Sequence, residues 1–281
     1  MFVRIIGTHP PIRVRALWRA PAADGKACAD AGAARIKSGV VRRIDLDSQP
    51  IAHGVALALA DREIMLAVRR SNRARRVALR VDPAAAEVEL VLPWRTSLAT
   101  GLRFAASRAV WISRRLAQVP PRVAFAHGAV LPVLGENVVI RHDPHARGPA
   151  RRDGDALVVA GRPEHLARRV RDWLTREARG VLWERTRIAA SKVERRVASI
   201  RLGDPRTRWG SCSASATIAF SWRLVLAPPA VLDYVVAHEV AHLVELNHGA
   251  RFWRLVERLA GDTSGPRAWL RINGPRLLRY G

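Results

Sequence analysis

The sequence has little cysteine, and it lacks long apolar runs. Cys28 and Cys212 are the only two cysteines in 281 residues, so no disulfide framework is expected and a reducing compartment suits the chain. No apolar run approaches the ~20 residues of a membrane-spanning helix. Arginines interrupt the N-terminal stretch, where a signal peptide needs a continuous apolar core. We therefore expect a cytoplasmic protein that does not engage a membrane.

Acidic residues and lysine are also scarce. The chain has 24 Asp and Glu against 48 Lys and Arg, which gives a formal net charge of +24. Only Lys26, Lys37 and Lys192 are lysines, so nearly all basic residues are arginines, as GC-rich coding produces. Such a basic surface attracts polyanions at low salt. The charge alone leaves open an incidental attraction and a functional contact with a nucleotide or a nucleic acid.

The hydrophobic pattern divides the chain into an extension and an α+β domain. Residues 1–62 show no sustained period and are expected to form a poorly ordered extension. The domain over 63–281 is expected to comprise a β-rich lobe over 63–160 and a catalytic lobe over 161–281. No internal repeat is apparent in the sequence.

Local patterns predict the elements of this domain. β-prone runs separated by turn-like residues predict a small antiparallel meander, and apolar residues at helical spacing predict one helix after it. Pro163 and the Pro228–Pro229 pair are suited to open two further helices. The expected strands lie at 64–68, 76–81, 88–92, 129–134, 137–142, 156–159, 198–202 and 217–226, and the expected helices at 98–116, 163–193, 229–246 and around 251–259.

The most informative stretch lies in the helix over 229–246 and reads HEVAHLVELNH from His238 to His248. Residues four apart stand one above the other on a helix, so His238 and His242 present two imidazoles to one point. Two such imidazoles are two of the three protein ligands of a catalytic Zn²⁺ site. Glu239 sits beside them, where it is suited to accept a proton from a water that zinc has made acidic.

A third ligand has to come from outside this pair. His248 follows His242 by six residues, and Asn247 is suited to a left-handed turn that ends the helix and brings His248 back to the metal. We expect His248 as the third ligand and expect Asn247 and Gly249 to build the turn. Glu245 and Glu257 are the alternatives.

The surrounding segments carry a family resemblance: Arg208–Cys212 (RWGSC), Ser221–Leu224 (SWRL), Asp233–Glu239 (DYVVAHE), Asn247–His248 and Phe252–Trp253. Together they resemble the YgjP-like metallopeptidase family, a bacterial group of predicted metal-dependent hydrolases related at the motif level to the SprT-like zinc proteases. The resemblance covers about 63–281. Ser221 stands where Asn is usual, and Gly249 where Ser usually follows the third histidine.

The resemblance implies a zincin-like C-terminal lobe that carries the HExxH helix after a β-rich N-terminal lobe. It implies zinc on His238, His242 and His248, with Glu239 as the general base. The two departures lie outside this ligand set, so they bear on substrate contacts and leave the zinc ligands intact.

The leading hypothesis is a zinc-dependent metallopeptidase that acts on a peptide or protein substrate. An extended substrate is expected to pair with an edge of the strand at 217–226, because main-chain pairing needs no special side chains. Arg208, Arg223 and Asn247 are the expected substrate contacts.

Two other functions remain open at this stage. Hydrolysis of a nucleoside triphosphate on the same metal site would use the guanidinium groups of Arg206, Arg208 and Arg223, although no Gly-rich phosphate loop is present. A nucleic-acid-associated protein with a structural zinc would explain the charge. It would leave Glu239 without a role, since structural sites are closed by four protein ligands.

Overall fold

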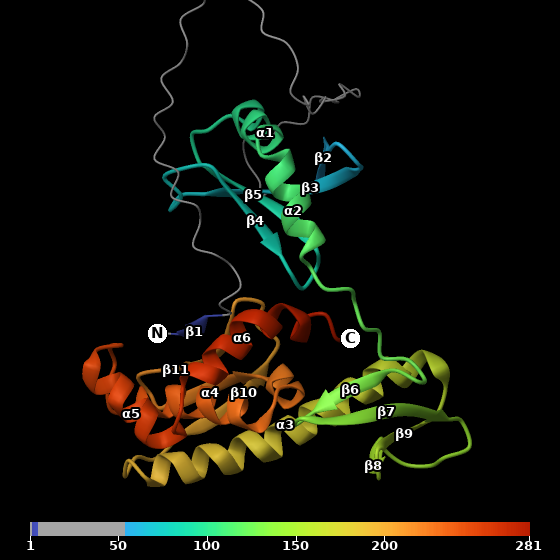
Figure 1. Ribbon diagram of the computed structural model, residues 1–281, viewed down its shortest axis with the longest axis vertical. Coiled ribbons are helices and arrows are strands. Elements are labelled where there is room, and N and C mark those ends of the chain that lie inside the picture. Colours follow the sequence, from blue (N-terminus) through green and yellow to red (C-terminus); the bar gives the residue numbers. More distant parts are fainter. Residues whose placement is uncertain (1, 5–53) are drawn as a thin grey trace, which may run out of the picture. The chain divides into compact units, whose positions relative to one another are not determined.

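The computed structural model describes residues 2–4 and 54–281, so most of the expected extension over 1–62 lies outside the described residues. Within the described residues the chain forms two compact units, one of residues 54–119 and one that combines 2–4 with 120–281 (Figure 1). Strand β2 (Gly54–Ala58) is part of the first unit, so residues 54–58 are ordered, contrary to the expected extension.

The first unit holds a four-stranded sheet in the order β2-β3-β5-β4, with β3 at Glu63–Ser71, β4 at Ala78–Asp82 and β5 at Glu87–Pro93. The predicted meander is wrong, because β5 inserts between β3 and β4 and pairs with β3 in parallel. Val88, Leu90 and Leu92 on β5 are almost fully buried. A strand with this much buried apolar surface is better placed in the centre of a sheet than at its edge.

The predicted helix over 98–116 is two helices, α1 (Leu98–Ala106) and α2 (Ala109–Ala117). The Ser97 side chain caps α1 by accepting from the main-chain N–H of Thr100. The Ser107 hydroxyl donates to the Phe104 carbonyl at 2.8 Å, and such a local bond competes with the helical pattern. Helix α2 then buries Ile112 in the core of the unit, against Leu66 and Val88 of the sheet.

The second unit repeats the topology of the first sheet. Its first sheet has the order β6-β7-β9-β8, and in both sheets the outer pairs are antiparallel while the two central strands run parallel. A helix follows the last strand in each case. The sequence shows no sign of this repeat. The four strands are β6 (Val130–Val133), β7 (Glu136–Asp143), β8 (Arg151–Asp153) and β9 (Ala156–Ala160).

A second sheet of this unit contains β11, the strand that contacts the helix carrying His238 and Glu239, which we call the metal helix. Its order is β1-β11-β12-β10, so β12 has a partner on both sides. The predicted strand over 217–226 ends at Ser221, whose hydroxyl accepts from the Arg223 N–H and starts a 3-10 helix. Because β12 lies between β11 and β10, it offers no free edge to the extended substrate that was expected to pair with it. The elements are β1 (Phe2–Arg4), β10 (Ser199–Gly203), β11 (Arg208–Cys212), β12 (Thr217–Ser221) and η2 (Trp222–Leu226).

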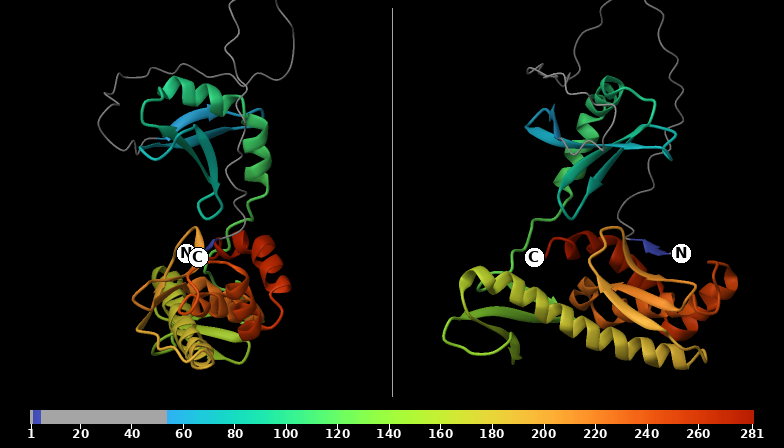
Figure 2. Two further views of the ribbon diagram at one scale, coloured as in Figure 1. Left: turned by 90° about the vertical axis from the view of Figure 1, so that its left-hand side faces the viewer. Right: turned by 180° about the vertical axis from the view of Figure 1, so that it is seen from behind.

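Helices pack around this sheet. Helix α3 lies along α4 and η2, and α4 also contacts α5, α6 and β11 (Figures 1 and 2). Because β6–β9 share a compact unit with these helices, the units divide after Val119 and not at the expected lobe boundary of 160/161. None of the described helices is long and apolar enough to cross a membrane. The helical bounds are η1 Pro163–His165, α3 Leu166–Ser191, α4 Pro229–Ala241, α5 Ala250–Ala260 and α6 Ser264–Leu277.

A buried arginine ties the C-terminal segment to this unit. Arg223 donates to both carboxylate oxygens of Asp204, at 2.6 and 3.0 Å. The third guanidinium nitrogen, Nη1, donates to the carbonyls of Leu277 and Tyr280, at 2.9 and 2.7 Å. Its guanidinium also lies 4.5 Å from the ring centroid of Trp222. These contacts satisfy Arg223 within the protein, which favours a structural role over the expected substrate contact.

Arg223→Met should lower the free energy of unfolding of this unit by about 3 kcal/mol, because it removes one partner of a largely buried network and leaves two carbonyls unpaired. Asp204→Asn is the matched variant. The Asp204 side chain is 46% exposed, so removing its charge should lower the free energy of unfolding by about 1 kcal/mol or less. Urea unfolding followed by tryptophan fluorescence measures both, and equally small losses would contradict the structural role.

Candidate metal centre

The metal helix α4 is buried on almost every face. From Val231 to Ala241 only Asp233 is more than marginally exposed, and Glu239 has no exposed surface. The helix ends at Ala241 and not at the expected Leu246, and His242 is its C-cap. The His242 Nδ1 lies 3.1 Å from the Glu245 carbonyl oxygen, to which it donates in the tautomer that leaves Nε2 free for a metal.

The chain returns to the site by a different turn from the expected one. Among the described residues, Asn247 is not one of those with a positive φ, and Gly249 has a φ of −78°. The Gly249 N–H donates to the Asn247 carbonyl at 2.8 Å, and α5 begins directly afterwards. Glu245 supports the site through its main-chain carbonyl, whereas Glu257 is exposed on α5. The early end of α4 therefore brings His248 back without a left-handed residue.

Three imidazoles converge at this point. His238, His242 and His248 each offer a nitrogen, and these atoms lie within 4.8 Å of one another. The Nε2 atoms of His238 and His248 are 3.0 Å apart. A tetrahedral Zn²⁺ with bonds of about 2.0–2.1 Å holds its nitrogens about 3.4 Å apart, so this spacing suits the ion.

The environment keeps these imidazoles neutral. Burial lowers the pKa of His238 to about 3, with further lowering by the charges of His242, His248 and Arg267. Burial likewise lowers the pKa of His242 to about 4 and also lowers the pKa of His248. A metal binds the neutral imidazole, so all three groups are in the ligating form at neutral pH.

The unsatisfied atoms also fit a metal. The His242 Nε2 is buried and has no hydrogen-bond partner within the part of the chain that the structure describes. Buried polar atoms are almost always paired, and a metal bound between the three imidazoles would supply this partner. Three neutral nitrogens suit Zn²⁺ better than Mg²⁺ or Ca²⁺, which take oxygen ligands.

Glu239 is held against strand β11. A Cβ atom placed on Gly210 would lie 2.6 Å from both Cγ and Oε1 of Glu239, closer than such contacts occur. Glycine at position 210 is therefore what allows the carboxyl group to reach the strand backbone. The negative charge of Glu239 also affects the neighbouring Cys212: burial and Glu239 together raise the pKa of the Cys212 thiol to about 11.

Aromatic rings and one cation surround the imidazoles. The buried Phe252 ring lies 4.6 Å from the rings of both His242 and His248, and Trp253 stacks on His248 at 5.7 Å. The exposed Arg267 of α6 lies 4.8 Å from the Trp253 centroid. Phe252 and Trp253 are among the segments that carry the family resemblance, whereas Arg267 was not expected at the site, because nothing in the sequence pattern of α6 marks it.

The other expected substrate contacts are placed as follows. Arg208 opens β11 and is half-buried, and Asn247 is exposed immediately before His248. Strand β11 contacts the metal helix α4, and Asn247 lies in the loop between α4 and α5. Arg223 instead faces Asp204 and the C-terminal carbonyls.

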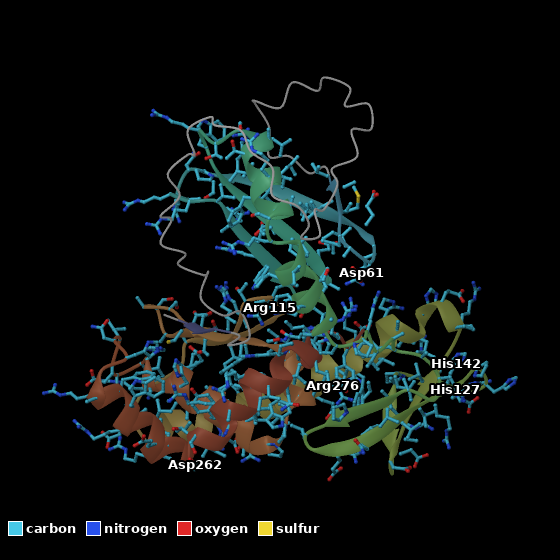
Figure 3. All side chains as sticks on the ribbon, turned by 45° about the horizontal axis from the view of Figure 1, so that its top comes forward. Asp61, Arg115, His127, His142, Asp262 and Arg276 are labelled. Carbon is cyan, nitrogen blue, oxygen red and sulfur yellow. The ribbon has the colours of Figure 1, made fainter. Side chains whose placement is uncertain are left out.

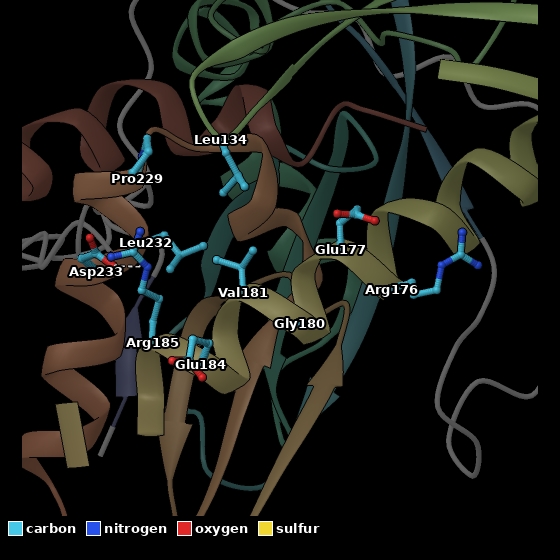
Figure 4. Close-up of a pocket in the computed structure, with 10 residues that line it drawn as sticks. All are labelled: Leu134, Arg176, Glu177, Gly180, Val181, Glu184, Arg185, Pro229, Leu232 and Asp233. Atoms are coloured by element: carbon cyan, nitrogen blue, oxygen red, sulfur yellow. Dashed lines mark ion pairs between the residues drawn. The ribbon is translucent and has the colours of Figure 1, made fainter. Parts of the chain in front are cut away.

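Neither of two other prominent features joins this centre. His127 and His142 lie on the β7 side of the unit, away from Asp262, which follows α5 (Figure 3). The main-chain N–H of His142 donates to the His127 ring, and the His142 Nε2 lies 2.6 Å from the Gly161 carbonyl oxygen. A cavity of about 440 Å³ lies between α3 and α4, but the histidines do not line it (Figure 4). Its lining is Leu134, Arg176, Glu177, Gly180, Val181, Glu184, Arg185, Pro229, Leu232 and Asp233.

The depressed histidine pKa values predict how the metal-free protein responds to acid. In the unfolded chain these imidazoles take up protons below about pH 6.5, whereas folded His242 and His238 resist until about pH 4 and about pH 3. The unfolded state then binds more protons, so the free energy of unfolding should fall as pH drops from 6.5 to 4, by at most about 1.4 kcal/mol per pH unit for each imidazole.

Urea midpoints of chelator-treated protein between pH 5 and 7.5 measure this slope. His242→Gln should make it shallower, while His145→Gln, at an exposed position, should leave it unchanged. An identical slope in all three proteins would contradict the assignment of the pH dependence to the buried imidazoles.

Comparison with known proteins connects this geometry to a family. A family model for the YgjP-like metallopeptidase domain matches residues 75–273, which begin within the first compact unit and include most of the second. Neither the curated proteins nor the solved structures gave a match. The matched region contains the three imidazoles, Glu239 and the RWGSC segment of β11. The chain belongs to the YgjP-like family of metallopeptidase domains.

Proposed function

We propose that this protein is a zinc-dependent peptidase in which His238, His242 and His248 hold the metal and Glu239 is the general base. The observation that carries the proposal is the convergence of three neutral imidazoles beside a fully buried carboxyl group of the same helix. Membership of a metallopeptidase family supports a hydrolase with a metal. Three protein ligands leave a fourth position for water or substrate, as catalytic sites require.

The residues of the chain divide the chemistry between them. Zinc held by the three imidazoles supplies a Lewis acid for the scissile carbonyl and lowers the pKa of water. Glu239 takes a proton from the attacking water and passes it to the departing amine. Its position against Gly210 fixes the direction from which it acts, because the β11 backbone blocks movement to that side.

Arg267 adds a positive charge at the same place. Burial lowers the pKa of His238 and the charge of Arg267 adds to that lowering, while burial raises the pKa of Tyr234 and the charge of Arg267 opposes that rise. The guanidinium therefore lies within electrostatic reach of the centre. In the described part of the chain it makes no hydrogen bond or ion pair through its side chain. We propose that it stabilises negative charge that develops on the substrate carbonyl.

The nucleotide hypothesis has less support. It relies on a group of guanidinium forks, and Arg223 of that group is bonded to Asp204 and to the C-terminal carbonyls. A structural zinc in a nucleic-acid-associated protein would not need a buried carboxyl group beside three neutral imidazoles. Peptide hydrolysis uses both features.

The first test separates the base from the ligands. Glu239→Gln keeps the size of the side chain but removes the group that accepts a proton, so peptide hydrolysis should fall by at least about 100-fold. Zinc content and thermal midpoint should stay near those of the unmodified protein. Peptide cleavage by the zinc-loaded chain, metal analysis and thermal unfolding on the same preparations give all three values.

His248→Ala is the contrasting variant, and it should lose zinc together with activity. Loss of zinc in Glu239→Gln would make that residue a ligand. Undiminished hydrolysis with full zinc would exclude it as the base. Cleavage of nucleoside triphosphates in place of peptides by the unmodified chain would overturn the peptidase assignment.

The second test concerns the contact between Glu239 and β11. Gly210→Ala should lower kcat at least tenfold while zinc is retained, because the new methyl group forces the carboxyl group away from the strand. Gly203→Ala on β10 is the matched control, since its added Cβ would meet nothing closer than Pro205 at 3.8 Å. Equal kcat values in the two variants would show that the position of the carboxyl group does not depend on Gly210.

A further inference from the structure

The outer edge of β11 carries an added strand from a distant part of the chain. Phe2–Arg4 pairs with β11 in the antiparallel direction, with Phe2 opposite Ser211 and Val3 opposite Gly210. On its other side β11 pairs with β12. Only three residues form the added strand, so few main-chain hydrogen bonds hold it in place.

This edge lies at the metal centre. Both β11 and β1 contact α4, the helix that carries His238 and Glu239. Gly210, the partner of Val3, is also the residue against which the Glu239 carboxyl group packs. An extended segment that pairs with Gly210 therefore runs past the general base.

We propose that the outer edge of β11 binds the peptide substrate as an added antiparallel strand, and that Phe2–Arg4 is an internal competitor for that edge. The inference rests on the proposed function and names its substrate class: an unfolded, extended segment recognised through its main chain. Strand addition uses main-chain bonds for affinity, so a three-residue strand of the same chain and a longer peptide can exchange.

The same geometry sets the register of the substrate. Its direction is opposite to that of β11, and the residue opposite Gly210 stands next to Glu239, so the scissile bond lies at or beside that residue. Proline or an N-methylated residue there removes a main-chain donor, and proline also fixes φ near −65°. Such peptides should bind poorly whatever their side chains.

The first experiment weakens the competitor in the full-length chain. Val3→Pro removes the N–H of the residue opposite Gly210, whereas Val3→Ala changes only the side chain and is the matched control. For cleavage of a quenched fluorescent octapeptide of alternating valine and serine, Val3→Pro should lower KM at least threefold with kcat unchanged, and Val3→Ala should match the unmodified protein. An unchanged or raised KM in Val3→Pro would overturn the competition.

The second experiment measures binding without turnover. Zinc-loaded Glu239→Gln should bind the fluorescein-labelled octapeptide, as anisotropy reports, and should bind its alternately N-methylated form at least tenfold more weakly. Equal affinity for the two peptides would overturn strand addition. Binding that requires unmethylated amides, together with no peptide cleavage by the unmodified protein, would sustain the strand edge and refute the proposed function.

A reversible lock provides a check that does not depend on the stability of a proline variant. With Cys28 and Cys212 replaced by serine in a Glu239→Gln background, Phe2→Cys and Ser211→Cys place a disulfide across a paired position of the two strands. The oxidised protein should bind the octapeptide at least tenfold more weakly than the same protein after reduction by a phosphine. Equal binding in the two states would show that Phe2–Arg4 and the peptide do not share the edge.

Discussion

Glu239 lies without exposed surface between α4 and β11, and a methyl group at Gly210 would fall 2.6 Å from its carboxylate oxygen. The rest of the site depends on this contact. A carboxyl group can be buried at such depth only where its partners are already in place, because an unpaired charge in an apolar interior is costly. Strand β11 and helix α4 must therefore pack at one fixed distance, and that distance also determines where His238 and His242 lie.

The surroundings of the three imidazoles impose a second constraint. Phe252 and Trp253 pack on the rings, and burial lowers the pKa of His238 to about 3. Neutral imidazoles held together at short distance are unfavourable for a protein without a metal, because polar nitrogen atoms are left without partners. The same arrangement favours a metal, since no protons have to be displaced before it binds.

The arginines of this chain serve in two different ways, either bonded inside the protein or exposed beside the metal centre. Arg223 uses its charge inside the protein, where it holds Asp204 and the C-terminal carbonyls. Arg267 lies exposed beside Trp253 and acts on the metal centre through its field. A net charge of +24 does not distinguish such cases, because composition counts charges without their partners. The contacts distinguish them.

The local features of this protein followed from its sequence. His238 and His242 share one side of a helix because their spacing matches the helical period, and Glu239 is their neighbour for the same reason. Most strands and the long helix α3 also appeared near the expected residues, since alternation and helical spacing are local signals. His248 was expected as the third member of the histidine cluster and lies there.

Only the tertiary structure decided which distant segments meet. Pairing of β3 with β5, the repeat of that topology in β6–β9 and the strand partners of β12 depend on contacts between residues far apart, which no local pattern encodes. Helix α4 ends at Ala241, and the His242 ring then contacts the Glu245 carbonyl, an arrangement that the helical spacing of the sequence does not encode. Gly210 is an ordinary strand residue in the sequence, and its need for a missing Cβ arises only because Glu239, 29 positions later in the numbering, packs against it.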